Sequence, residues 1–367
     1  MRQTCTFRPY RSWYVSITES PASAERSAAA PPAAAPPGPR GFPRAAGLLA
    51  ALLLVAAVVV LSLAIGARHL SPIDAWHGLV DEHSANYPVV RQMRLPRTLL
   101  GLLVGAALGV AGALMQALTR NPLADPGLLG INAGASAAVV TAISLLGITS
   151  LTGYVWFAFG GAAAVAVLLW SVGGGRTATP ARLALAGTAL NAALFAYVNA
   201  VQLLDTAALD RMRFWTVGSL AAARPRTVVE IAPFVAAGLL LTAALARPLN
   251  ALALGDDAAR GLGAHPTRVR AGAIVAVTLL CGAATAAAGP IVFVGLMVPH
   301  LVRPLTGPDL RWLLPYCAVL APLMLLGADV LGRVLARPSE LQVGIVTAVL
   351  GGAFFVGIVR RARRAGA

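Results

Sequence analysis

The sequence predicts an all-α protein that spans a membrane about ten times. Hydrophobic residues make up 58% of its 367 residues and charged residues only 12%, a composition too apolar for a soluble domain of this length. Its apolar runs are long enough to cross a bilayer, which takes about 20 helical residues. Most charged residues fall between these runs, which indicates short polar loops.

Two regions differ in composition. Residues 1–44 are rich in Ala, Pro, Ser and Arg, a mixture that cannot bury a core, and we expect a disordered cytoplasmic tail there. Residues 45–364 form the predicted membrane domain. Its apolar runs lie at 45–67, 98–118, 128–147, 153–172, 182–204, 228–246, 269–288, 289–302, 311–332 and 342–359. The eighth is the weakest, because it is short and only the Gly289-Pro290 pair separates it from the seventh.

The distribution of arginine predicts how the chain is oriented. With ten spans and the N-terminus inside, 19 of the 29 basic residues lie on the cytoplasmic side, as the positive-inside tendency requires. Both termini are then cytoplasmic. Without the tail the margin narrows to 13 against 10, so the loops favour the same orientation only slightly.

Several classes of function are disfavoured by composition. The sequence contains no lysine, so a phosphate-binding loop of the G-x-x-x-x-G-K-[ST] type is excluded and any ATP hydrolysis must occur in a separate subunit. The net charge of +15 does not indicate nucleic-acid binding, because the arginines do not cluster with interleaved aromatic residues. Cys5, Cys281 and Cys317 have no metal-ligand spacing, and we predict neither a metal site nor a catalytic residue.

The most informative stretch runs from Arg94 to Ser136. Gly101, Gly105 and Gly109 recur at every fourth position of its apolar run and form a stripe where another helix can approach closely. Such a stripe is also common in polytopic proteins of any function. The segment NPLADPG that follows is more distinctive, since its two prolines force a turn before the chain re-enters the membrane.

Three motifs of this stretch, RLPR, GAALGVAGALMQ and NPLADPGLLGINAGA, resemble the FecCD family, the permease subunits of ABC importers for iron-siderophore complexes, haem and vitamin B12. The motif PSELQVGIVT at 338–347 resembles the family too, although Gln342 stands where proline is usual. The resemblance covers residues 45–364 and implies the type II ABC importer permease fold. It also implies the partners, which are a second copy or close paralogue of the permease, two nucleotide-binding ATPase subunits and an extracytoplasmic substrate-binding protein.

On the outer side the resemblance implies a docking site for that binding protein. Arg94 and Arg97 of RLPR, and Arg333 of ADVLGR, are expected to receive its acidic side chains. Asp329 lies four residues before Arg333, so the two can share a helix face and pair. Such a pair contributes only tenths of a kcal/mol when exposed, so we expect it to orient the guanidinium. The alternative is that these arginines reach anionic lipid headgroups.

On the inner side, the segment LALGDDAARGLGAHPTRVR at 252–270 predicts two short helices, the first capped by Asp256 and the second started by Pro266. The family pattern LALGxxxARxLG implies that this coupling loop docks on the ATPase subunit. The residues expected to do so are Leu254, Gly255, Ala259, Arg260, Leu262 and Gly263. An amphipathic turn lying on the membrane surface is the alternative.

Polar residues inside the spans are few, and burying them against lipid is costly, so they are expected to face other helices or a wet cavity. The resemblance implies a path between two permease copies, lined by the fifth and tenth spans. The candidates there are Thr188, Asn191, Thr347 and Gly351.

These inferences predict a subunit that moves a ferric-siderophore complex across the cytoplasmic membrane without a cofactor of its own, ATP and magnesium being bound by the partner ATPase. Haem or cobalamin is the alternative cargo, since the binding protein sets selectivity. An ion-coupled secondary transporter is the competing class. It would need intramembrane carboxylates, which only Asp329 approaches.

Overall fold

The computed structural model describes residues 44–66, 70–148, 151–172, 180–337 and 339–365, and in these ranges the regular structure is entirely helical. The predicted tail lies outside the described residues except for Arg44, which begins the first helix. The described helices belong to one compact unit.

Each of the ten predicted apolar runs corresponds to a helix, so the expected all-helical fold with about ten spans is confirmed. The helices are α1 (Arg44–Ala64), α3 (Leu95–Thr119), α4 (Ile131–Ser144), α5 (Leu151–Val172), α6 (Pro180–Leu204), α8 (Pro225–Ala253), α10 (Pro266–Ala288), α11 (Val294–Thr306), α12 (Leu310–Leu335) and α13 (Val343–Ala365). Seven contain an apolar stretch of at least 18 residues. The other three, α4, α11 and α13, are shorter in their apolar part.

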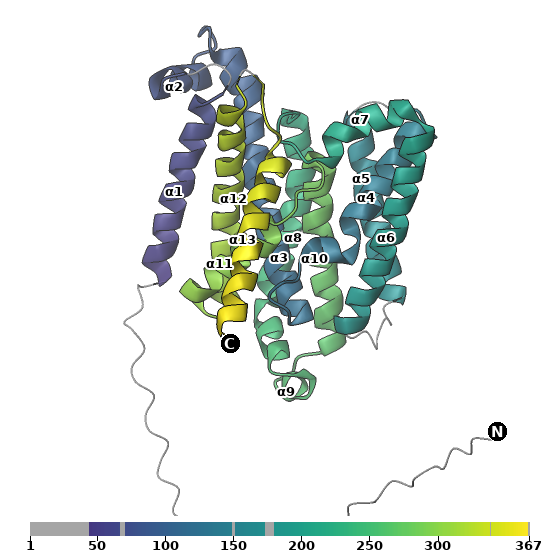
Figure 1. The fold of residues 1–367 in the computed structure, drawn as a ribbon. Coiled ribbons are helices and arrows are strands. Elements are labelled where there is room, and N and C mark those ends of the chain that lie inside the picture. Colours follow the sequence, from purple (N-terminus) through teal and green to yellow (C-terminus); the bar gives the residue numbers. More distant parts are fainter. Residues whose placement is uncertain (1–43, 67–69, 149–150, 173–179, 338, 366–367) are drawn as a thin grey trace, which may run out of the picture. The chain divides into compact units, whose positions relative to one another are not determined.

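Five further elements are too short or too polar to stand out in hydropathy. They are α2 (Pro72–Val80), η1 (Pro88–Arg94), η2 (Pro126–Leu129), α7 (Thr206–Thr216) and α9 (Asp256–Gly261). Figure 1 shows α2 and α7 at one end of the bundle and α9 at the opposite end. We call these the α2 end and the α9 end. The first residue of α1 and the last turn of α13 lie toward the α9 end (Figure 1).

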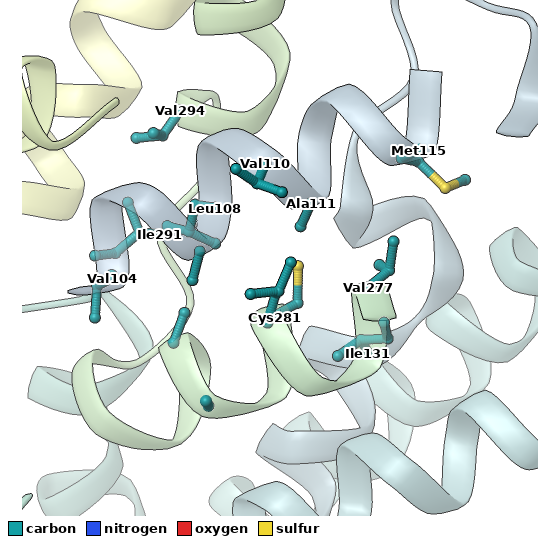
Figure 2. Close-up of a cluster of buried hydrophobic side chains, with 14 of the residues drawn as sticks. Val104, Leu108, Val110, Ala111, Met115, Ile131, Val277, Cys281, Ile291 and Val294 are labelled. Carbon is teal, nitrogen blue, oxygen red and sulfur yellow. The ribbon is translucent and has the colours of Figure 1, made fainter. Parts of the chain in front are cut away.

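The middle of the bundle is built on α3 and α10, whose apolar windows are each 78% buried within the chain. The two helices pack on each other, and α3 also contacts α8, α11 and α12. Figure 2 shows Leu108 and Ala111 of α3 facing Cys281 of α10 across this contact. Cys281 is 1% exposed and acts there as a small hydrophobic residue.

The glycine stripe of α3 is a helix-packing face, as predicted. A Cβ atom on Gly105 would lie 2.5 Å from Cα of Pro322 in α12, and one on Gly109 would lie 2.7 Å from the carbonyl oxygen of Cys317. Gly112 meets the backbone of Gly295 at the start of α11 in the same way. The absence of side chains on α3 therefore brings three helix backbones into direct contact.

Two chain breaks meet near the midpoint of α3. A Cβ atom on Gly295 would lie 3.0 Å from the carbonyl oxygen of Leu108 and 3.0 Å from Cδ of Pro126. The helices after these breaks, α4 and α11, each follow a residue with positive φ, Gly130 and Phe293. They contain 14 and 13 residues, fewer than the ~20 that a bilayer crossing takes, so the irregular segment before each helix completes its span. Irregular backbone at such depth is tolerated where it is packed in protein or lines a cavity.

Candidate functional site

At the α2 end, Arg333 of α12 binds the C-terminal end of α1. Its Nη1 atom donates to the carbonyl oxygens of Ser62 and Ile65 at 2.9 and 2.7 Å, and Nη2 donates to Oγ of Ser62 at 2.8 Å. The side chain is only 2% exposed. The last carbonyls of a helix have no partner within the helix, so the guanidinium supplies the hydrogen bonds that α1 lacks.

Arg94, the last residue of η1, binds the same helix end. Its Nη1 atom donates to the carbonyl oxygens of Leu63 and Ala64, both at 2.7 Å. Gly66 leaves the room for this contact, since a Cβ atom there would lie 2.6 Å from Nη2 of Arg94. The two arginines therefore cap α1 together, each from a different helix.

Asp329 connects Arg333 to the third predicted docking residue. Its carboxylate accepts from Nη2 of Arg333 at 2.7 Å and from Nη2 and Nε of Arg97 at 2.8 and 3.1 Å. Arg97 in turn donates from Nη1 to Glu340 at 2.6 Å. The predicted pair of Asp329 and Arg333 is therefore present. Asp329 is fully buried because α1, α3 and α12 close around it.

A cavity of about 200 Å³ opens beside this network, lined by Arg94, Arg97, Arg333 and Glu340 together with Gly66, Val89, Met93 and Ala221. The structure thus brings all three predicted docking arginines to one site. Each of the three donates hydrogen bonds to other residues of this chain. Solvent reaches the pair of Arg97 and Glu340, whose side chains are 11% and 32% exposed.

At the α9 end, the predicted coupling loop consists of the short helix α9 and the first turn of α10. The first predicted helix is α9, but its N-cap is Gly255, with φ of 111°, instead of Asp256. The second predicted helix is the first turn of the long helix α10, which begins at Pro266. The prediction of a separate second helix is wrong because the chain after Pro266 continues into the apolar run without a break.

The six predicted coupling residues lie on and beside α9. Leu254 and Leu262 are 69% and 67% exposed, whereas Ala259 is buried toward the bundle. Arg260 pairs with Asp257 at 2.7 Å on the helix surface. Gly255 and Gly263 lie on either side of the helix and both have positive φ, a conformation that residues with a Cβ atom rarely adopt. One short helix is therefore flanked by two exposed leucines.

A larger cavity, of about 550 Å³, lies between α4, α6 and α13. Its polar lining consists of Asp125, Asn132, Ser136, Asn191 and Thr216, and the residues of α13 that line it are Gly344, Ile345, Ala348 and Val349. The cavity is placed where the break before α4 opens the helical backbone. We call it the polar cavity.

Of the four predicted path residues, Asn191 lines the polar cavity. Thr188 is exposed on α6, where its Oγ1 atom donates to the carbonyl oxygen of Ala184. Thr347 and Gly351 lie on the packed face of α13. Thr347 is 0% exposed and donates to the carbonyl oxygen of Gly344, and a Cβ atom on Gly351 would meet Phe293.

Comparison with known proteins places this arrangement in a family. The model of the FecCD transport family matches residues 52–361. The chain belongs to the FecCD transport family. It is 45% identical to the ferric enterobactin transport system permease protein FepD of Escherichia coli (strain K12), over 88% of this chain and 98% of that protein. It is 38% identical to the hemin transport system permease protein HmuU of Yersinia pestis, over 85% of this chain and 96% of that protein.

A solved structure shares the fold of this FecCD protein. It is described as an inward-facing conformation of a metal-chelate type ABC transporter, and it superposes with a TM-score of 0.76 at 28% identity over 86% of this chain and 99% of that one. The chain is therefore a multi-pass membrane permease subunit and not an enzyme. The ATPase of such transporters is a separate subunit, in agreement with the absence of lysine from this sequence.

Two polar residues of the cavity were not singled out from the sequence. Asp125 precedes η2 and accepts a hydrogen bond from the backbone N–H of Gly127 at 2.7 Å, and Asn132 accepts one from Oγ1 of Thr285 in α10 at 2.9 Å. The prolines of NPLADPG predicted a turn at a membrane surface. The polar residues that follow this turn were a sign that the segment lines a cavity. Hydropathy alone does not show how deep in the membrane such residues lie.

Proposed function

We propose that this FecCD protein is the permease subunit of an ABC importer that carries a ferric-siderophore complex inward across the cytoplasmic membrane. The observation that carries the proposal is the match to FepD over nearly the whole of both chains, since FepD is named for ferric enterobactin. HmuU, which matches almost as completely, is named for hemin. Haem is therefore the nearest alternative cargo, and cobalamin the next.

The α9 end is the cytoplasmic side in this proposal, and the α2 end faces outward. The excess of arginine in the segments assigned to the inside supports this orientation. Both termini are then cytoplasmic. The exposed leucines beside α9 support its role as the coupling helix, because a short helix with apolar side chains suits a groove on an ATPase subunit.

The arginine cavity at the α2 end is the proposed docking site for an extracytoplasmic binding protein. Its lining carries three guanidinium groups and one carboxylate, so it favours an acidic side chain on the partner. Arg97 is the residue best placed for direct contact, because its side chain is 11% exposed and pairs with Glu340, which is 32% exposed. Arg94 and Arg333 support this site because their hydrogen bonds fix the end of α1.

The transport path is proposed to run through the polar cavity, closed on its open side by a second permease copy or a paralogue. The apolar window of α6, one wall of this cavity, is only 11% buried within the chain. A second copy packed there would convert a half-open cavity into a central path. Asn191 is then the predicted path residue in direct contact with cargo.

An ion-coupled secondary transporter is less well supported. Asp329, the carboxylate that the sequence offered for such coupling, is held by hydrogen bonds from two arginines. A carboxylate already paired with two guanidinium groups is poorly placed to bind a coupling cation.

The proposed function is tested by accumulation of radiolabelled cargo in cells that lack this chain. Cells complemented with the chain, and with the chain plus an ATPase-dead partner subunit, are given ferric enterobactin, hemin or cobalamin. The proposal expects ferric-siderophore uptake to return with the chain and to be lost again with the dead ATPase. Recovery of hemin or cobalamin uptake alone would overturn the choice of cargo, and uptake independent of the ATPase would overturn the importer class.

A further inference from the structure

At the α9 end, the carboxylate of Asp256 joins three helices. Asp256 is the first residue of α9, and both of its oxygens accept from Nη2 of Arg270 in α10, at 2.8 and 2.9 Å. Nη2 of Arg120, at the end of α3, lies 3.3 Å from Oδ1. The same nitrogen of Arg120 donates to the carbonyl oxygen of Leu252 at 2.6 Å, at the end of α8. The Asp256 side chain thus connects α9 to α10 and to the end of α3.

Arg120 contacts Asp256 of the coupling helix and begins the segment that leads to the polar cavity. It is the C-cap of α3 and has a φ of 52°, one of two non-glycine residues with positive φ in the described part of the chain. Such a conformation is costly for a residue with a Cβ atom, so surrounding contacts must hold it. The chain that follows Arg120 turns at Asn121 and reaches Asp125 and Gly127, which line the cavity, within seven residues.

Of the three charged side chains, only Arg270 is largely buried, since those of Arg120 and Asp256 are 44% and 33% exposed. Exposed ion pairs contribute little to the free energy of folding. Arg270, however, is only 12% exposed, and its buried Nε atom has no hydrogen-bond partner among the described residues. An unsatisfied buried donor is unfavourable, so the paired contact to Asp256 is what retains this guanidinium in its place.

We propose that Asp256 is a positioning residue that makes α9 move as one body with the inner ends of α3 and α10. Through Arg120 it carries a displacement of α9 to the turn at residues 121–127 and so to the wall of the polar cavity. The inference rests on the proposed function, because it assumes that an ATPase subunit moves α9. It names the side chain by which that movement reaches the path.

Asp257 provides a matched control in the same helix. It carries the same charge one residue later, its side chain is 99% exposed, and it pairs with Arg260 of α9 itself. Replacing Asp257 by Asn removes an acidic group from α9 without touching the contact to α3 or α10. Replacing Asp256 by Asn removes one charge as well, but breaks both contacts.

The test uses the complete complex with its ATPase subunits in proteoliposomes, with binding protein and ferric enterobactin. The ratio of cargo imported to ATP hydrolysed is measured for the wild type, Asp256→Asn, Arg120→Gln, Asp257→Asn and the conservative variant Asp256→Glu. We expect the ratio to fall at least about fivefold in Asp256→Asn and Arg120→Gln, to remain close to wild type in Asp257→Asn, and to be partly restored in Asp256→Glu. Co-purification of the ATPase subunits shows that assembly is intact.

A second readout needs no transport. Hydrogen exchange of the backbone amides at 256–262 in the purified permease is expected to be faster in Asp256→Asn than in Asp257→Asn, because the tie to α3 and α10 is lost. An unchanged transport ratio in Asp256→Asn, an equal loss in Asp257→Asn, or equal exchange in both variants would overturn the inference. A wild-type complex without ATP-driven import would instead overturn the proposed function, and the exchange difference would still decide whether Asp256 ties α9 to the bundle.

Discussion

The carboxylate of Asp329 lies 2.7 Å from Nη2 of Arg333, and both side chains are buried where α12 passes the end of α1. Through this pair, two arginines of the proposed docking site also hold helices of the bundle together. Arg333 connects α12 to α1, and Asp329 connects Arg333 to Arg97 of α3. The α2 end of the bundle is therefore held together by charge-assisted hydrogen bonds, which are stronger than neutral ones.

Replacing Arg333 by Glu is expected to destabilise the protein, because a second buried carboxylate would face Asp329 and the carbonyl oxygens of α1. Breaking a buried ion pair typically costs roughly 3–5 kcal/mol. Thermal unfolding in detergent, followed by intrinsic fluorescence, measures the effect. Arg337→Gln is the control, since Arg337 is exposed and makes one long contact of 3.4 Å to the carbonyl oxygen of Gly66. An unfolding temperature of Arg333→Glu equal to that of the control would contradict this role.

Glu340 and Arg97 give a separate prediction for docking of the binding protein. Glu340 occupies Nη1 of Arg97, so Glu340→Gln is expected to strengthen docking, and Arg97→Gln to weaken it, each roughly severalfold at low salt. Surface plasmon resonance with the immobilised complex measures both affinities at two ionic strengths. Weaker docking in Glu340→Gln would show that the glutamate, and not the arginine, contacts the partner.

The packing of α3 on α11 predicts that Gly112 tolerates no side chain. A Cβ atom there would overlap the backbone of Gly295, which cannot move aside as a flexible side chain can. Gly112→Ala is expected to lose roughly 1–3 kcal/mol of stability, the usual range for overpacking. Gly327→Ala in α12, where a Cβ atom meets nothing within 4 Å, is expected to be neutral or stabilising. Equal unfolding temperatures of the two variants would contradict the close contact.

These contrasts show how far the sequence could be interpreted. The ten apolar runs and the glycine stripe were predictable, because bilayer thickness and helix geometry act on residues close in sequence. The burial of Arg333 was not, since its acceptors belong to α1, some 270 residues earlier. The depth of the break before α4 was hidden for a similar reason. Pro126 is placed by Gly295 and Leu108, and no local pattern reports that contact.

Asp309, the N-cap of α12 at the α9 end, predicts a pH effect on stability. Hydrogen bonds from Arg311 lower the pKa of this carboxyl to about 2 from its ordinary value of 3.8, with Asn250 adding a further donor. A depressed folded-state pKa stabilises the fold above the unfolded value, and this contribution is lost as pH falls from about 4 to about 2. Asp309→Ala should therefore lower the unfolding temperature at pH 7, by loss of a cap of about 1 kcal/mol. The difference from wild type should shrink toward pH 2, and a difference independent of pH would contradict the ionised cap.

A comparison of Asn191 in α6 with Thr347 in α13 tests the proposed transport path. Asn191 of α6 lines the polar cavity, whereas Thr347 of α13 is fully buried and is not one of the residues that line it. Asn191→Trp is expected to abolish or strongly reduce uptake by filling part of the cavity, with the protein still inserted, because the cavity of about 550 Å³ leaves room for the larger side chain. Thr347→Val keeps the shape of the side chain and removes one hydrogen bond, to the carbonyl oxygen of Gly344, so uptake should stay near wild type. Uptake of labelled ferric siderophore, normalised to the amount of protein in the membrane, compares the two variants. The reverse result, with transport lost in Thr347→Val and kept in Asn191→Trp, would place the path on the packed face of α13, and the polar cavity would then be a lipid-facing hollow.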